Sequence, residues 1–129
     1  MSQVKIYGLR LAVEPIRQVL SDTIHDCMVE CLKIPTDKRF HRFILLNKED
    51  FIYPESRSEY YLIIEVLMIA GRSESTKKQL IKSLFTQITE RVGIANENVE
   101  ICLIESPAVN WGFRGMTGDE ASLPYSTSI

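Results

Sequence analysis

The arginine at position 72 stands where proteins often bind a small molecule. Arg72 follows the strongest strand pattern of the sequence, "YYLIIEVLMIA", and ligands of α/β sheets often bind just outside the C-terminal ends of strands. It also precedes a predicted helix, where a cation gains nothing from the helix dipole. The alternative is that Arg72 is an ordinary solvated arginine in a turn. The unfavourable position of a cation at the start of a helix makes this alternative less attractive.

Aromatic and cationic side chains occur together in the glycine-rich segment "NWGFRGMTGDE". Trp111 and Phe113 could form the wall of an apolar pocket, with Arg114 beside them. The same residues could anchor a contact between subunits, since Trp and Arg are common at the centres of interfaces. The glycine spacing does not match a phosphate-binding loop.

A third candidate group lies in "PTDKRFHRF". Strand alternation places Arg39 and His41 on one face, next to Asp37. This face could line a pocket, or it could be a solvated strand face.

These residues must be positioned by strands and helices that the hydrophobic pattern predicts. We expect one helix to start at Glu14-Pro15 and end at "KIPTDK", and another to start at Ser73 or Ser75 and end at Gly93. The predicted strands are residues 4–9, 42–46, 60–70 and 98–106, with a possible short strand at 125–129.

The order of these elements is βαβ followed by βαβ, and the two halves match weakly at a spacing of about sixty residues. We therefore predict an α+β fold in which duplicated β-α-β units form a four-stranded mixed sheet with two helices on one face. The single domain would span residues 1–129, with halves at about 2–50 and 59–106 and a loop-rich tail at 107–129. The uncovered face predicts an oligomer.

Composition is that of an ordinary globular protein. The 129 residues carry a net charge of −2, which favours no nucleic-acid partner. We expect no membrane span, no secretory leader and a cytoplasmic location. Cys27, Cys31 and Cys102 lack the spacing of a metal site, so we expect buried thiols and no metal.

Six segments carry a resemblance to a known family. This chain resembles the tautomerase superfamily, which includes 4-oxalocrotonate tautomerase, macrophage migration inhibitory factor and malonate semialdehyde decarboxylase, and in particular a bacterial long-chain branch. The segments are "VKIYG", "LSDTIHDCMVECLKIPTDKRFHRF", "EDFIYP", "YYLIIEVLMIAGRSESTKKQLIKSLF", "VEICLIE" and "NWGFRGMTGDE".

The resemblance implies a homotrimer with a pocket at the N-terminus of the first strand and no cofactor. In active members a proline follows the initiator methionine, and its amine serves as general base or acid on an enol or keto acid. Arginines bind the substrate carboxylate, for which the planar guanidinium is well suited. The resemblance favours Arg72 in this role and places residues 111–114 at the border of the pocket.

Ser2 stands where this family has its proline, and three interpretations follow. Removal of Met1 would leave the primary amine of Ser2 as the base. Asp37 could instead carry the chemistry, because it lies where decarboxylase-like members of the family place a catalytic acidic residue. The match to the family is uncertain by about one position here, so Lys38 is an alternative, and Arg39 next to it could contact the ligand. The third interpretation is a pocket that binds a small carboxylate without catalysis.

The resemblance thus implies a cofactor-independent isomerase or decarboxylase of a small keto or enol acid, with Ser2 in place of the usual proline. The alternative is a non-catalytic trimer that binds small anions or serves a structural role. Ser2 and Asp37 are the catalytic candidates. The candidate substrate-binding residues are Arg39, Arg72, Trp111, Phe113 and Arg114.

Overall fold

A computed structural model describes residues 2–129, so expectations about Met1 lie outside the described residues. The first half contains β1 (Ser2–Leu9), α1 (Arg10–Val13), α2 (Arg17–Leu32) and β2 (His41–Leu46). The second half contains β3 (Leu62–Ile69), α3 (Glu74–Val92) and β4 (Val99–Ser106), followed by the short strands β5 (Gly112–Phe113) and β6 (Met116–Thr117). Four 3-10 turns occupy Glu14–Ile16, Lys48–Asp50, Asn96–Asn98 and Ala108–Asn110.

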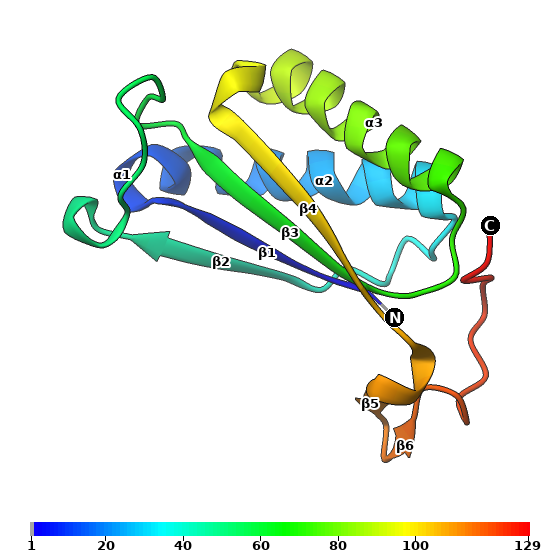
Figure 1. Cartoon of the computed structure of the whole chain (residues 1–129). Coiled ribbons are helices and arrows are strands. Elements are labelled where there is room, and N and C mark those ends of the chain that lie inside the picture. Colours follow the sequence, from blue (N-terminus) through cyan, green and yellow to red (C-terminus); the bar gives the residue numbers. More distant parts are fainter. Residues whose placement is uncertain (1) are drawn as a thin grey trace.

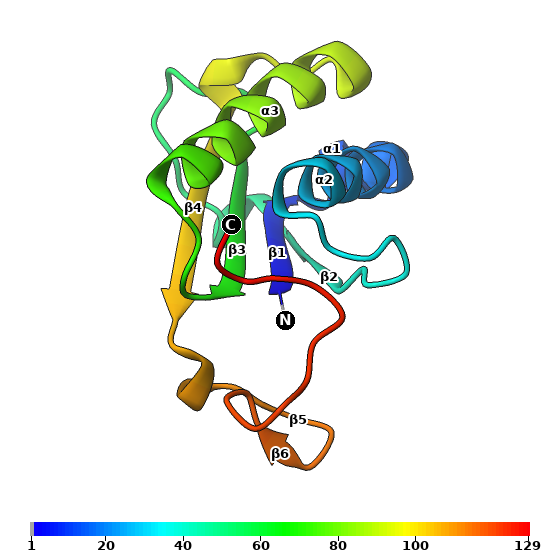
Figure 2. The same ribbon diagram turned by 90° about the vertical axis from the view of Figure 1, so that its right-hand side faces the viewer.

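The four long strands form one mixed sheet in the order β2-β1-β3-β4. The central pair, β1 and β3, is antiparallel, and each of them pairs in parallel with its outer neighbour. Helices α2 and α3 lie side by side on one face of this sheet (Figures 1 and 2). The predicted α+β fold and the central position of the 60–70 segment are therefore confirmed.

The two β-α-β units match at an offset of 60 residues. Val4 pairs with His41 in the first half, and Ile64 pairs with Ile101 in the second, so both partners shift by 60 positions. The helices also end alike, because each C-cap adopts a left-handed conformation, at Lys33 (φ 57°) and at Gly93 (φ 82°). Because β1 and β3 are antiparallel, Ser2 at the start of β1 pairs with Met68 near the end of β3, which leads to Arg72.

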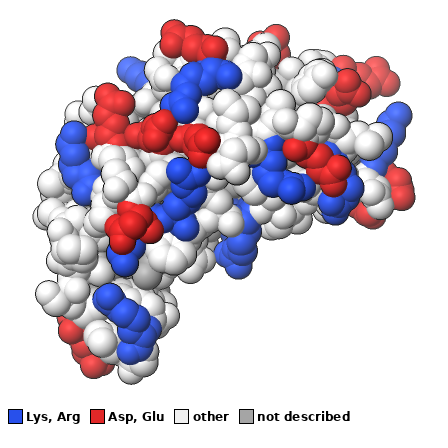
Figure 3. Space-filling view, turned by 180° about the vertical axis from the view of Figure 1, so that it is seen from behind, with Lys and Arg blue, Asp and Glu red and all other residues white. Residues whose placement is uncertain are grey.

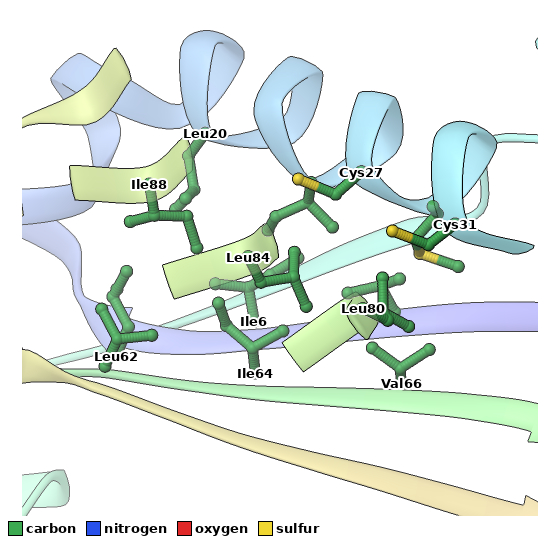
Figure 4. Close-up of a cluster of buried hydrophobic side chains, with 14 of the residues drawn as sticks. Ile6, Leu20, Cys27, Cys31, Leu62, Ile64, Val66, Leu80, Leu84 and Ile88 are labelled. Carbon is green, nitrogen blue, oxygen red and sulfur yellow. The ribbon is translucent and has the colours of Figure 1, made fainter. Parts of the chain in front are cut away.

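The core lies between the sheet and the two long helices (Figure 4). Alternate residues of β1 and β3 face the helices, and Ile6, Leu62 and Ile64 among them are fully buried. Leu84 and Ile88 of α3 pack against them (Figure 4). This alternation fixes the register of both central strands, since a slip of one residue would expose the whole apolar set.

Two local predictions were wrong. Residues 125–129 form no strand, and the tail instead contains the β5–β6 hairpin, which projects away from the body as an arm (Figures 1 and 2). Cys27 and Cys31 are buried as expected, but Cys102 is exposed because its side chain points to the sheet face opposite the helices.

The sheet face opposite the helices carries polar groups as well as apolar ones. Tyr7 donates a hydrogen bond of 2.9 Å to Glu65, and Lys5 lies 3.7 Å from the same carboxylate. Positive and negative side chains are interspersed over the molecular face seen in Figure 3, without a large area of one sign. This distribution agrees with the nearly balanced composition.

Candidate active site at the start of the first strand

A small cavity of about 30 Å³ lies at the N-terminal end of β1. Ser2, the first residue of β1, lines it and is only 5% exposed. The other lining residues come from the loop before β2, from the arm and from the tail; they are Lys38, Phe40, Arg114, Leu123, Pro124 and Tyr125. Two lining residues are cationic and none is acidic, so the cavity favours an anion.

The loop that carries Lys38 is fixed by hydrogen bonds at both ends. His25 of α2 bonds through its Nε2 to the main-chain oxygen of Thr36, at 2.7 Å. The amide of Val4 donates to the main-chain oxygen of Phe40, at 2.9 Å. In the sequence, Lys38 was only the alternative to Asp37 as the catalytic residue of this segment. The structure places Lys38 in the cavity wall, whereas Asp37 is exposed in the adjacent turn.

Arg72 is the most unusual side chain at this end of the sheet. It is 4% exposed, and its Nη1 donates to the main-chain oxygen of Ile69 at 3.3 Å. Its Nε and Nη2 are buried and have no hydrogen-bond partner among residues 2–129. Burial lowers the pKa of the guanidinium, because desolvation disfavours the charged form, whereas Tyr125 and Glu105 act in the opposite direction. Arginine nevertheless stays protonated, so the fold keeps a buried cation with free donors.

Arg114 reaches the cavity from the tip of the arm. Arg114 and Gly115 join β5 to β6 with positive φ angles of 55° and 79°, as in a type I′ hairpin turn. Asn or Gly would suit the first of these positions better, since a bulky side chain is strained there. The geometry of the turn therefore does not explain why an arginine occupies position 114. Its place in the cavity wall, where it supplies a cation on the same cavity as Ser2, does explain it. Its guanidinium also lies 5.2 Å from the ring centre of Phe113.

The remaining predicted site residues do not line this cavity. Arg39 pairs with Asp22 of α2 at 2.6 Å, and together with Gln3 it borders a separate, open hollow. Phe113 is half-buried in the arm. Trp111 is also half-buried, and its indole nitrogen is buried without a partner among the described residues. The structure thus brings together Ser2 and Arg114, with Arg72 next to the Tyr125 wall.

Sequence reasoning missed Tyr125, which links the cavity to Arg72. Its ring packs on the edge of the core. Burial raises the pKa of its hydroxyl, and the nearby charge of Arg72 acts in the opposite direction. The sequence offered a weak signal at most, because Tyr125 lies in a tail without periodicity and was expected only as part of a short strand.

His41 is half-buried and does not line the cavity; it belongs to a polar cluster beside Arg39. Its Nδ1 lies 2.8 Å from the hydroxyl of Ser21. The pKa of His41 is lowered to about 4, mainly by desolvation and also by the charges of Arg39 and His25, while Asp22 acts in the opposite direction.

We expect this histidine to weaken the fold in acid. Between about pH 6.5 and 4 the unfolded chain binds a proton at His41 that the folded chain does not, so stability falls as the pH falls through this window. Allowing for solvent screening, the loss is about 1–2 kcal/mol. Urea unfolding of the wild type and of His41→Gln at pH 7 and pH 4.5 measures it. An equal loss in both proteins would contradict this assignment.

The described residues carry neither a metal site nor a membrane span. Within residues 2–129 no three side chains of the His, Cys, Asp and Glu types are grouped closely enough to hold a metal ion. No helix in that range is both long and apolar enough to cross a bilayer.

The comparison with protein families decides the classification. A family model described as a tautomerase enzyme matches residues 38–114, more than half of the chain. This chain belongs to the tautomerase family. The match includes Lys38 and Arg114, which line the cavity, and the buried Arg72, which follows the C-terminal end of β3.

Individual relatives agree with the family. The probable tautomerase YusQ of Bacillus subtilis (strain 168) is 29% identical over 101 residues, which cover 74% of this chain and 80% of that protein. A crystal structure of the FG41 malonate semialdehyde decarboxylase inhibited by 3-bromopropiolate has a TM-score of 0.80 and 25% identity, covering 95% of this chain and 99% of that one. The asymmetric trimer of a fused 4-OT has a TM-score of 0.81 at 17% identity, covering 92% and 97%.

In this tautomerase-family protein the cation-lined cavity lies at the start of β1. The long strands and helices position the site, but apart from Ser2 the cavity is lined by loop residues, which are Lys38 and Phe40 before β2 and Arg114, Leu123, Pro124 and Tyr125 after β5. Irregular segments on a rigid scaffold commonly carry function.

Proposed function

We propose that the Ser2–Arg72 end of the sheet binds a small keto or enol carboxylic acid and promotes its isomerisation or decarboxylation without a cofactor. The observation that carries this proposal is Arg72, whose Nε and Nη2 are buried without a partner in the part of the chain that the structure describes. A carboxylate oxygen pair fits such a guanidinium edge by two parallel hydrogen bonds. An unpaired buried cation costs stability, and ligand binding would offset this cost.

The remaining residues have distinct proposed roles. Arg114 and Lys38 would stabilise negative charge that develops on an enolate oxygen. Proton transfer needs a base that takes the enol proton and an acid that returns a proton to carbon. The amine of Ser2, with Met1 removed, suits both steps because its ordinary pKa is about 7.7–8.0. Asp37 is exposed and would need a loop movement to take part.

Self-association belongs to the same proposal. The fused 4-OT is a trimer, and we propose that this chain also forms a homotrimer through its uncovered sheet face. That face carries the Tyr7–Glu65–Lys5 network beside half-buried Ile63 and Leu67, a mixed surface of the kind that subunit interfaces use.

A second candidate is a family member that binds a small carboxylate without catalysis. Two observations favour it. Serine occupies position 2, where active members have the catalytic proline, and the cavity of about 30 Å³ has room for little more than one water molecule. Both candidates require the same cationic site, and they differ in proton transfer.

The ketonisation of phenylenolpyruvate, followed by ultraviolet absorbance, separates them. For an enzyme we expect a rate above that of buffer that falls by at least about 100-fold in Arg72→Met and is retained in Arg17→Met. Arg17 is a half-exposed arginine of α2 and serves as the matched control. A wild-type rate equal to that of buffer would overturn the enzymatic proposal for this acid and favour non-catalytic binding.

A further inference from the structure

The last nine residues, 121–129, form an extended segment that crosses the end of the sheet and stops beside the start of α3 (Figure 2). We call it the strap. Its burial alternates, since Leu123, Tyr125 and Thr127 are half-buried and the residues between them are exposed. One side of the strap therefore lies flat on the body of the protein.

The strap contacts both parts of the proposed site. Leu123 and Tyr125 close the cavity beside Ser2, and Tyr125 is near enough to Arg72 for the two side chains to affect each other's pKa. Gly71 lets the strap pass close to the main chain, because a Cβ at Gly71 would lie 2.8 Å from the main-chain oxygen of Thr127. Arg72 directly follows Gly71 and is buried, so it lies beside the place where the strap crosses.

The hold on the strap is weak. Its last anchor is the main-chain oxygen of Ile129, which accepts hydrogen bonds from Ser73 at 3.1 Å and Thr76 at 2.7 Å. Within the described part of the chain, residues 122–129 make no backbone-to-backbone hydrogen bond. Segments with few buried contacts and few backbone hydrogen bonds open at low free-energy cost.

The size of the closed cavity shows why opening matters. Sites for small ligands usually have volumes of roughly 300–1,000 Å³, whereas the closed cavity has about 30 Å³. A carboxylic acid of the proposed class does not fit beneath the closed strap.

We propose that residues 121–129 are a removable cover that must lift from Gly71 and Arg72 before a carboxylate can bind. This inference rests on the proposed function for its ligand, but not for the movement itself. The apparent ligand affinity is then the affinity of the open form multiplied by the fraction of molecules in which the strap is open. Loosening the strap raises affinity without changing a residue that contacts the ligand.

Chemical modification of Arg72 by phenylglyoxal tests the movement without any ligand. Peptide mass spectrometry would follow Arg72, with the half-exposed Arg17 of the same molecule as the reference. We expect Arg72 to react at least about tenfold more slowly than Arg17 in the wild type, because only the open fraction is modified.

Thr76→Val removes one anchor hydroxyl but leaves the helix cap, in which the amide of Thr76 donates to Ser73. We expect it to accelerate modification of Arg72 about fivefold, the effect of one hydrogen bond. Thr86→Val, an exposed threonine on the same helix, is the matched control and should leave the rate unchanged. Equal rates in the two variants, or fast modification of Arg72 in the wild type, would overturn the cover.

The same experiment separates this inference from the proposed function. With 3-phenylpropionate added to Thr76→Val, we expect slower modification of Arg72. Acceleration by Thr76→Val without protection by 3-phenylpropionate would retain the cover and count against the carboxylate site.

Discussion

Arg72→Met is expected to stabilise the folded protein by about 1–3 kcal/mol. Arg72 is buried, and two of its nitrogen atoms have no partner among the described residues. In the unfolded chain, water hydrates both of these atoms. Methionine fills a similar volume without an unsatisfied donor and adapts to irregular surroundings. Urea unfolding at pH 7 measures the difference, with Arg17→Met changing stability by less than about 0.5 kcal/mol.

A structural role for Arg72 predicts the opposite sign. If its single hydrogen bond to Ile69 held β3 to the start of α3, the methionine variant would be less stable than the wild type. A loss of more than about 1 kcal/mol, the value of one hydrogen bond, would therefore contradict a site that trades stability for binding. Functional sites often show this trade.

Ser2→Pro is expected to raise the ketonisation rate by about 10²–10⁴-fold, the usual contribution of a positioned acid–base group. Proline is tolerated at the first residue of a strand, and Ser2 is the first residue of β1. The expected gain requires removal of Met1, which places the ring amine beside the cations of the cavity.

Ser2→Ala is the matched control, because alanine is also small but leaves a primary amine without a ring. Intact mass establishes the N-terminus of each variant, and circular dichroism compares the folds. No gain in a correctly processed and folded Ser2→Pro protein would show that this site lacks more than its base.

The regular elements were predictable because each depends on local chemistry. Alternation in β1 and β3 and the cap at Ser73 follow from neighbouring residues. The start of the first long helix was less well placed. The chain turns helical directly after β1 as α1, Pro15 lies in a 3-10 turn, and α2 begins at Arg17.

The walls of the site were less predictable, because long-range contacts decide them. Nothing near Tyr125 in the sequence indicates that it meets Arg72, since the strap is positioned by Gly71, Ser73 and Thr76. Similarly, strand alternation predicted which face Arg39 occupies, but the direction of its side chain is decided by its ion pair with Asp22. Residue types therefore indicated cationic chemistry, while the structure decided which cations meet.

The most direct test of the carboxylate site is an equilibrium titration of the wild type and Arg72→Met with 3-phenylpropionate, which cannot tautomerise. We expect saturable binding to the wild type that is weakened at least about tenfold in Arg72→Met, the loss of one charge-assisted contact, and unchanged in Arg17→Met. Equal affinity of the wild type and Arg72→Met would contradict a carboxylate site built on this buried arginine.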